Sequence, residues 1–124
     1  MKCLFCIIFS HLLSFVAAQN TIPNVLEKLN TKSVPYITVE ELQANENYIF
    51  LDARESKEFN VSHIKNAINV GFENFDAKKI SSILLDKKAT IVVYCSIGVR
   101  SEKIGEKLLK LGYKKCLQLI WRHF

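Results

Sequence analysis

The sequence has few cysteines outside its N-terminal apolar run. Of its four cysteines in 124 residues, Cys3 and Cys6 lie in an apolar N-terminal run, which leaves Cys95 and Cys116 for the rest of the chain. Two cysteines are too few for a disulfide framework. No cysteine follows the N-terminal run at the point where a lipoprotein would be modified. The chemistry of a single thiol is therefore the feature to explain, and Cys95 is the candidate.

Long hydrophobic runs are lacking after residue 18. The run at residues 3–18 follows Met1-Lys2 and ends in the small residues 16–18, which is the layout of a secretory signal peptide cleaved before Gln19. It is short and quickly followed by polar residues, which disfavours a transmembrane helix. We expect a periplasmic or secreted protein with no stable membrane insertion after cleavage. An uncleaved anchor is the alternative.

The basic charge is small and not concentrated. The formal net charge is +5, and it falls to +4 without Lys2. The lysine pairs at 78–79, 87–88 and 114–115 are dispersed, without aromatic residues between them, which indicates solvated surfaces rather than a nucleic-acid partner. With 49% hydrophobic and 23% charged residues, the chain fits one globular domain, which we expect to be a monomer.

A strand, a loop and a helix are predicted around Cys95. Residues 90–94 read T-I-V-V-Y, a run that suits a strand buried on both faces of a parallel sheet. Residues 102–111 carry Ile104, Leu108 and Leu111 at helical spacing. Cys95 therefore lies between a strand's carboxyl end and a helix N-terminus. Unpaired N–H groups and the helix dipole there favour an anion such as a thiolate.

The residues after the cysteine support this interpretation. Gly98 permits a tight turn with N–H groups pointing inward, and Arg100 adds a permanent positive charge with a planar donor fork. A buried structural cysteine before an ordinary turn is the alternative, but the combination favours an anion-binding loop. The candidate loop residues are Cys95, Ser96, Ile97, Gly98, Val99, Arg100 and Ser101.

Residues 93–101, V-Y-C-S-I-G-V-R-S, resemble the active-site signature of the rhodanese family, C-x-x-G-x-R-S after a strand. The resemblance also bears on the reaction. Phosphatases of the tyrosine-phosphatase type carry C-x5-R, whereas Cys95 to Arg100 is C-x4-R, the shorter loop typical of sulfur-transferring rhodaneses. Sulfur transfer is thus favoured over phosphatase or arsenate reductase chemistry.

Two further stretches resemble a second signature of that family. Residues 52–59 read D-A-R-E-S-K-E-F and residues 63–70 read H-I-K-N-A-I-N-V. The family usually has glycine where this chain has Ser62 and Asn66, so we expect altered local turns there. Arg54 follows a strand's carboxyl end on the same edge as Cys95 and is expected to line the pocket. The expected supporting residues are Asp52, Glu58 and His63.

A purely structural alternative exists for two of these charges. Arg54 and Glu58 stand at i,i+4 and would pair on a helix, which contributes about 0.3–0.5 kcal/mol when exposed.

The order of predicted elements gives the fold class. Strands are expected at 36–37, 48–51, 67–70, 90–94 and 115–120, and helices at 39–44, 72–85 and 102–111. Thr38 and Glu41 form a capping box at the first helix, Gly112 caps the last, and a short helix is expected around Val25. This alternation predicts an α/β protein with a mostly parallel five-stranded sheet flanked by helices, which is also the rhodanese fold. The domains expected are a signal peptide at 1–18, a lead-in at 19–35, a rhodanese-like domain at 36–119 and an atypical tail at 120–124.

The C-terminus departs from the family pattern, which continues with a strand, two glycines and a helix. Residues 116–124 can be back-translated as TGT TTA CAA CTT ATA TGG CGG CAT TTT, and reading one base later gives Val-Tyr-Asn-Leu-Tyr-Gly-Gly-Ile. The codons in this back-translation are chosen among synonymous ones so that the shifted frame gives the family pattern. We interpret the result as a single-base frameshift near residue 116. On that interpretation Cys116, Trp121, Arg122 and His123 have no function.

The resemblance implies a sulfurtransferase that needs no metal or organic cofactor. Cys95 would take sulfane sulfur from a small anionic donor such as thiosulfate, hold it as a persulfide and pass it to a thiol or cyanide. The loop N–H groups would stabilise the sulfur, and Arg100 would attract the donor. The alternative is a non-catalytic or redox-sensing binding module with the same fold.

Overall fold

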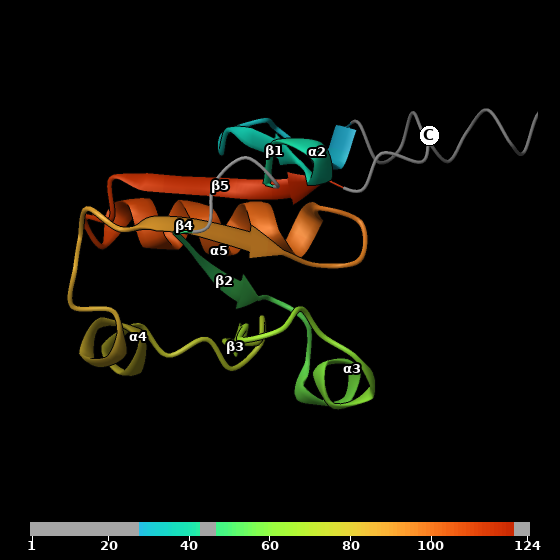
Figure 1. The fold of residues 1–124 in the computed structure, drawn as a ribbon, viewed down its shortest axis with the longest axis horizontal. Coiled ribbons are helices and arrows are strands. Elements are labelled where there is room, and N and C mark those ends of the chain that lie inside the picture. Colours follow the sequence, from blue (N-terminus) through green and yellow to red (C-terminus); the bar gives the residue numbers. More distant parts are fainter. Residues whose placement is uncertain (1–27, 43–46, 121–124) are drawn as a thin grey trace, which may run out of the picture. The chain divides into compact units, whose positions relative to one another are not determined.

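Five parallel strands form one sheet in the part of the chain that this computed structural model describes, residues 28–42 and 47–120. The strand order is β1-β5-β4-β2-β3, so β5, last in sequence, lies between β1 and β4. The predicted parallel α/β sheet is confirmed (Figure 1). The strands are β1 Tyr36–Thr38, β2 Tyr48–Asp52, β3 Ile68–Asn69, β4 Thr90–Tyr94 and β5 Lys115–Ile120.

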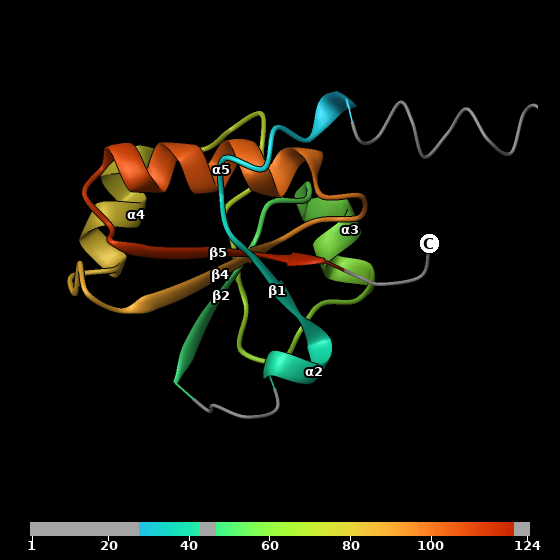
Figure 2. The ribbon, with the colours of Figure 1, turned by 90° about the horizontal axis from the view of Figure 1, so that it is seen from above.

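Helices cover both faces of the sheet. They are α2 Val39–Leu42, α3 Ser56–Val61, α4 Ala77–Ile83 and α5 Val99–Lys110. Alternation along β4 supplies both apolar layers. Ile91 and Val93 pack with residues of α4 and α5, while Val92 and Tyr94 pack with Val39 and other residues on the α2 side. Figure 2 shows α4 and α5 on one side of the sheet and α2 on the other.

Three predicted helices differ in extent from those observed. The helix expected at 72–85 is only Ala77–Ile83, because Asp76 accepts the N–H groups of Lys78 and Lys79 and so caps a later start. The helix expected at 102–111 begins at Val99 instead. The helix expected at 39–44 is described only as Val39–Leu42; residues 43–46 lie outside the described part.

The predicted helix caps are confirmed. Glu41 accepts the N–H of Thr38 at 2.7 Å, and the Thr38 hydroxyl accepts that of Glu41 at 3.4 Å. At the end of α5, Gly112 has φ +90°, the left-handed conformation that glycine adopts most easily. The Gly112 N–H bonds the carbonyl of Leu109 and that of Tyr113 bonds Leu108, the two bonds of a Schellman motif.

The two positions without the family's glycine are accommodated differently. Asn66 has φ +63°, a left-handed conformation that asparagine tolerates better than most residues. Ser62 is extended at φ −164°, which any residue adopts. Asn66 therefore adopts a backbone conformation that glycine would also adopt. The altered turn that we expected at this position is not seen.

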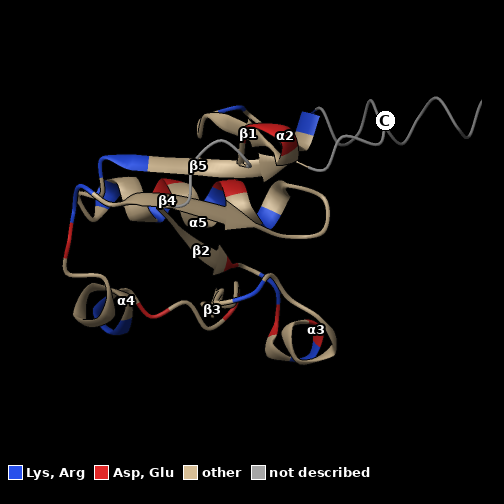
Figure 3. Cartoon of the chain, in the orientation of Figure 1, with Lys and Arg blue, Asp and Glu red and all other residues tan. Residues whose placement is uncertain are grey.

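The chain's ends are mostly outside the described residues. The expected signal peptide, most of the segment around Val25 and the tail at 121–124 fall there, so these stay predictions. No helix in the described ranges is long and apolar enough to cross a membrane. Figure 3 shows basic and acidic segments interleaved along α5, where Lys103, Lys107 and Lys110 are exposed and Glu102 is fully buried.

Candidate active site

The Cys95 sulfur sits in a nest of hydrogen-bond donors at the carboxyl end of β4. The cysteine is 2% exposed. Its Sγ accepts the backbone N–H of Gly98 at 3.2 Å and that of Ser101 at 3.4 Å. These are the donors that a thiolate, or a sulfur atom attached to it, requires. The predicted position of Cys95 between strand and helix is confirmed.

The start of α5 is closer to the cysteine than the sequence suggested. Gly98 is the N-cap, with φ +88°, and Val99, Arg100 and Ser101 form the first helical turn. The left-handed conformation at Gly98 reverses the chain tightly enough for the helix N-terminus to face the sulfur. Twelve residues of helix then place the positive end of their dipole at Cys95.

Hydroxyl groups complete the contacts of the loop. The Cys95 Sγ is 3.4 Å from Ser101 Oγ, which in turn donates to the carbonyl of Gly98 at 3.0 Å. Ile97 is 51% exposed, so its side chain points away from the buried layer. The sequence predicted all these residues as one loop, and the structure brings Cys95, Gly98 and Ser101 around one sulfur atom.

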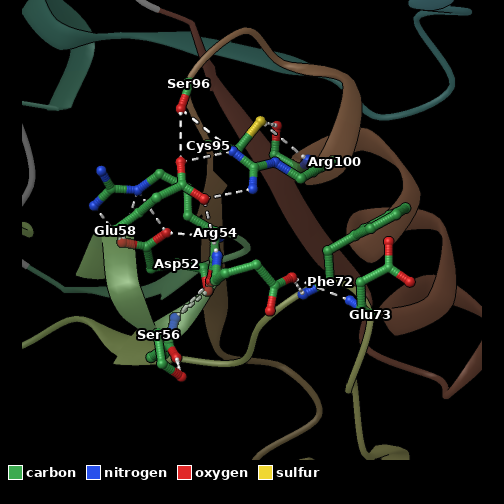
Figure 4. A network of polar contacts seen from close by, with 12 residues as sticks. Asp52, Arg54, Ser56, Glu58, Phe72, Glu73, Cys95, Ser96 and Arg100 are labelled. Carbon is green, nitrogen blue, oxygen red and sulfur yellow. Dashed lines mark hydrogen bonds and ion pairs between the residues drawn. The ribbon is translucent and has the colours of Figure 1, made fainter. Parts of the chain in front are cut away.

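Arg100 is bound to α3. Its Nη1 donates to Glu58 Oε2 at 2.7 Å and its Nη2 to Glu58 Oε1 at 2.9 Å, while Ser96 Oγ lies 3.3 Å from both Arg100 Nη2 and Glu58 Oε1. The guanidinium holds the pKa of Glu58 down at about 2, and the carboxylate raises the pKa of Arg100. Figure 4 shows this network beside Cys95. Glu58 therefore supports the loop by fixing Arg100.

The alternative pairing of Arg54 with Glu58 is not formed. Arg54 binds Asp52 instead, with Nε 3.0 Å from Oδ1 and Nη2 2.6 Å from Oδ2, and its Nη2 also donates to the carbonyl of Ser62 at 2.7 Å. The reason is that α3 begins only at Ser56, so Arg54 and Glu58 do not share a helix. Asp52, expected as a supporting residue, is fully buried and holds the Arg54 side chain.

A pocket of about 310 Å³ opens next to the cysteine. Arg54, which was expected to line the pocket, is on its wall, and so is His63, which was expected only to support the structure. Cys95 and Ser96 were also predicted to belong to the site. The remaining wall residues, Ser62, Ile64 and Tyr94, were not predicted to line it. Tyr94 was detectable in principle, since it precedes the cysteine on the strand. The lining residues are Arg54, Ser62, His63, Ile64, Tyr94, Cys95 and Ser96.

Two polar residues that the sequence analysis did not single out, the half-buried Glu55 and the buried Gln118, also shape the site. Glu55 accepts the N–H groups of Phe72 and Glu73, both at 3.2 Å, and joins Glu58 in a capping box at α3. Gln118, fully buried on β5, donates from Nε2 to the carbonyl of Gly98. The alternation of buried residues along a strand does not indicate which distant atom a side chain contacts, so the sequence did not predict this hydrogen bond.

Cys116 has a different environment from Cys95. It is buried on β5 with its neighbours Ile91 and Tyr113 in the apolar core, and burial raises its pKa to about 11. A thiol with that pKa is protonated at neutral pH and is a poor nucleophile. The choice of Cys95 over Cys116 as the reactive thiol is thus consistent with the structure.

Comparison with known proteins settles the family. The model of the rhodanese-like domain matches residues 37–120. The chain belongs to the rhodanese family. Among solved structures, the rhodanese chain is similar to a rhodanese from E. coli, with 27% identity, a TM-score of 0.53 and coverage of 57% of this chain and 82% of that one. A rhodanese-related protein from Thermoplasma volcanium is 29% identical, with a TM-score of 0.58 and coverage of 68% and 82%.

Curated relatives carry a different name. A tRNA uridine(34) hydroxylase of Onion yellows phytoplasma is 38% identical over 76 residues, covering 57% of this chain and 24% of that protein. One from Photorhabdus laumondii is 32% identical over 90 residues, covering 68% and 26%. The chain therefore spans about a quarter of the length of these relatives. A single-domain sulfurtransferase of Saccharomyces cerevisiae, 18% identical with a TM-score of 0.56 and coverage of 73% and 85%, shares the fold.

Proposed function

We propose that this rhodanese-family chain moves sulfane sulfur from a small anionic donor such as thiosulfate to a thiol or cyanide through a persulfide on Cys95. The observation that carries the proposal is the position of the sulfur. Cys95 Sγ receives two backbone N–H groups at a helix N-terminus and also lines a pocket. Such an arrangement stabilises negative charge on sulfur while leaving space for a donor.

The reaction is a double displacement. The Cys95 thiolate attacks the outer sulfur of thiosulfate, the sulfur–sulfur bond of the donor breaks, and sulfite leaves with the bonding electron pair. The outer sulfur stays on Cys95 as a persulfide held by the loop. A thiol or cyanide then attacks that sulfur and releases the Cys95 thiolate. The scheme uses no metal or organic cofactor.

The names of the curated relatives suggest a second activity, hydroxylation of a tRNA uridine. We do not propose it for this chain, because the match covers about a quarter of those proteins. The cysteine loop with its helix N-terminus supports sulfur transfer directly. We further propose that the protein acts as an exported monomer without a nucleic-acid partner. Size-exclusion chromatography tests the oligomeric state. N-terminal sequencing of the exported protein, which should begin at Gln19, tests the export.

Intact mass after thiosulfate treatment tests the proposal. The parent should gain roughly 32 Da, one sulfur atom, and lose it when cyanide is added, with thiocyanate appearing in solution. Cys95→Ser should gain nothing while keeping the parent's circular dichroism, because a hydroxyl is too weak a nucleophile to accept sulfur. Cys116→Ser is the matched control and should load like the parent. A non-catalytic or redox-sensing module would show no mass gain in any variant.

A further inference from the structure

We infer that His63 is a catalytic residue of the second half-reaction, carrying a proton from the acceptor thiol to the transferred sulfur. The inference rests on the proposed sulfurtransferase function. Its starting point is the pocket of about 310 Å³, in which His63 and Cys95 are both wall residues. A molecule that fills this pocket to reach Cys95 therefore lies against His63.

One nitrogen of the His63 ring has a defined role. Nδ1 lies 2.8 Å from the carbonyl oxygen of Phe59. Because a carbonyl only accepts hydrogen bonds, Nδ1 carries the hydrogen, and in the neutral ring Nε2 keeps its lone pair. The imidazole is also stacked on the Phe59 ring, with centroids 3.7 Å apart and planes 10° apart. A base whose other nitrogen is held by a fixed acceptor is the arrangement that nucleophilic enzymes use.

The structure gives Nε2 no hydrogen-bond partner among the described residues. His63 is exposed, as are the neighbouring lysines Lys57 and Lys65. A ring held on one edge and open on the other can exchange protons with a molecule in the pocket. General acid–base catalysis needs a nitrogen that is available in this way.

The other ionisable groups near the pocket are occupied. Arg54 is bound to Asp52 and to the carbonyl of Ser62, and its hydrogen bond with Asp52 raises its pKa. The Tyr94 hydroxyl accepts the N–H of Ile64, and burial raises its pKa. Glu58 is bound to Arg100. Arg54 and Tyr94 thus hold their protons at neutral pH, and among the pocket's lining residues His63 is the one suited to accept a proton.

The step balances without an oxidant or reductant. Nε2 takes the proton of the acceptor thiol, and the resulting thiolate attacks the outer sulfur of the Cys95 persulfide. A sulfur–sulfur bond forms to the acceptor while the bond from Sγ to the outer sulfur breaks, and its electron pair stays on Sγ as the thiolate. Nε2 then passes the proton to the transferred sulfur. The products are a protonated acceptor persulfide, a neutral His63 and the Cys95 thiolate.

Single-turnover kinetics on the full chain separate the two half-reactions. The chain is loaded with thiosulfate, freed of donor and mixed either with a small thiol or with sulfite. Sulfite attacks the persulfide as an anion and needs no proton transfer, so it serves as the internal control. His63→Asn keeps an amide donor near the position of Nδ1 but removes Nε2, and Lys65→Gln is the matched control on the same segment.

In His63→Asn, discharge to the thiol at pH 7 should fall by about 10²-fold, a much larger loss than that of loading or of discharge to sulfite, because neither of those steps transfers a proton. Added imidazole should restore part of the thiol rate, which a purely structural loss would not allow. His63→Gln should behave like His63→Asn, and Lys65→Gln like the parent.

The outcomes separate this inference from the function on which it rests. If the parent never gains sulfur from thiosulfate, the proposed function fails and the role of His63 fails with it. If the parent loads and His63→Asn discharges to the thiol at the parent rate, the proton role is wrong while sulfur transfer stands. Equal slowing of thiol and sulfite discharge, without imidazole rescue, would also overturn the inference, because it would mean a distorted pocket.

Discussion

Arg100 and Glu58 form a bidentate ion pair, with Nη1 2.7 Å from Oε2 and Nη2 2.9 Å from Oε1, that ties the first turn of α5 to α3. The two residues are 42 positions apart in the chain. The positive charge beside the cysteine loop is therefore shared with a carboxylate. This relationship decides how the role of Arg100 is tested.

Replacement of Arg100 tests whether its charge attracts the donor. A charge-assisted contact contributes about 1.5–3 kcal/mol, so Arg100→Ala should lower kcat/KM for thiosulfate by about 10- to 150-fold. Glu58→Gln is the comparison, because it removes the competing carboxylate and leaves the guanidinium. If kcat/KM for thiosulfate is retained or improved in Glu58→Gln, the Arg100 guanidinium attracts the donor. An equal loss in both variants would show that the pair acts only by holding the loop.

The same ion pair predicts a pH dependence of stability. The folded pKa of Glu58 is about 2, below its ordinary value of 4.5, so the ionised carboxylate stabilises the fold above about pH 4.5 and this contribution is lost as the pH falls toward 2. The pair is partly exposed, with side-chain exposures of 26% and 37%, which limits the effect to at most about 1 kcal/mol. The difference in Tm between the parent and Glu58→Gln should shrink steadily between pH 5 and pH 2. A constant difference over that range would contradict the prediction.

Gln118 should position the loop that holds the reactive sulfur. Its Nε2 donates to the carbonyl of Gly98, whose N–H donates to Cys95, and its Oε1 has no partner among the described atoms. Gln118→Met removes the donor without much change in shape, so sulfur transfer should fall by about 2- to 10-fold, the effect of one neutral hydrogen bond. The free energy of unfolding should change little, because the unpaired buried oxygen is removed as well. A Gln118→Met variant with parent kinetics for sulfur loading would exclude this role.

Gly105 should be intolerant of alanine although it lies in the middle of a helix. A Cβ there would be 2.8 Å from Val34 Cγ2 and 3.1 Å from Cγ1. Alanine favours helix over glycine by about 1 kcal/mol, but overpacking costs about 1–3 kcal/mol, so Gly105→Ala should lower the free energy of unfolding in urea. In a Val34→Ala background the same change should become neutral or stabilising. A loss of the same size in both backgrounds would rule out the contact with Val34 as the cause.

The frameshift interpretation of the C-terminus predicts a more stable protein in the other frame. In the structure β5 pairs with both β4 and β1, and Cys116, Gln118 and Leu119 are buried. The shifted segment Val-Tyr-Asn-Leu-Tyr-Gly-Gly-Ile places apolar residues at the first and fourth positions and an amide at the third, so it suits the same strand. Extended in that frame, the chain should show a higher Tm and solubility, because further residues would cover apolar surface at about 25 cal/mol per Å². Resequencing is the direct check, and a confirmed frame with a stable, active 124-residue product would reject the interpretation.

The sequence alone determined the parts of this protein that depend on neighbouring residues. The T-I-V-V-Y run predicted β4, the alternation of strands and helices predicted the parallel sheet, and Thr38 with Glu41 predicted a capping box, because each signal comes from contacts within a few residues. The placing of Cys95 between a strand and a helix was local in the same sense.

The tertiary structure decided which distant groups meet at that loop. Arg100 forms an ion pair with Glu58 of α3. Gln118 contacts Gly98 because β5 lies between β1 and β4. His63 and Cys95 line the same pocket. The spacing of apolar and polar residues in the sequence does not predict these contacts, because they depend on the order of strands in the sheet and on where α3 begins. The sequence therefore indicated the reactive sulfur, and the packing of α3 and β5 around it determined its partners.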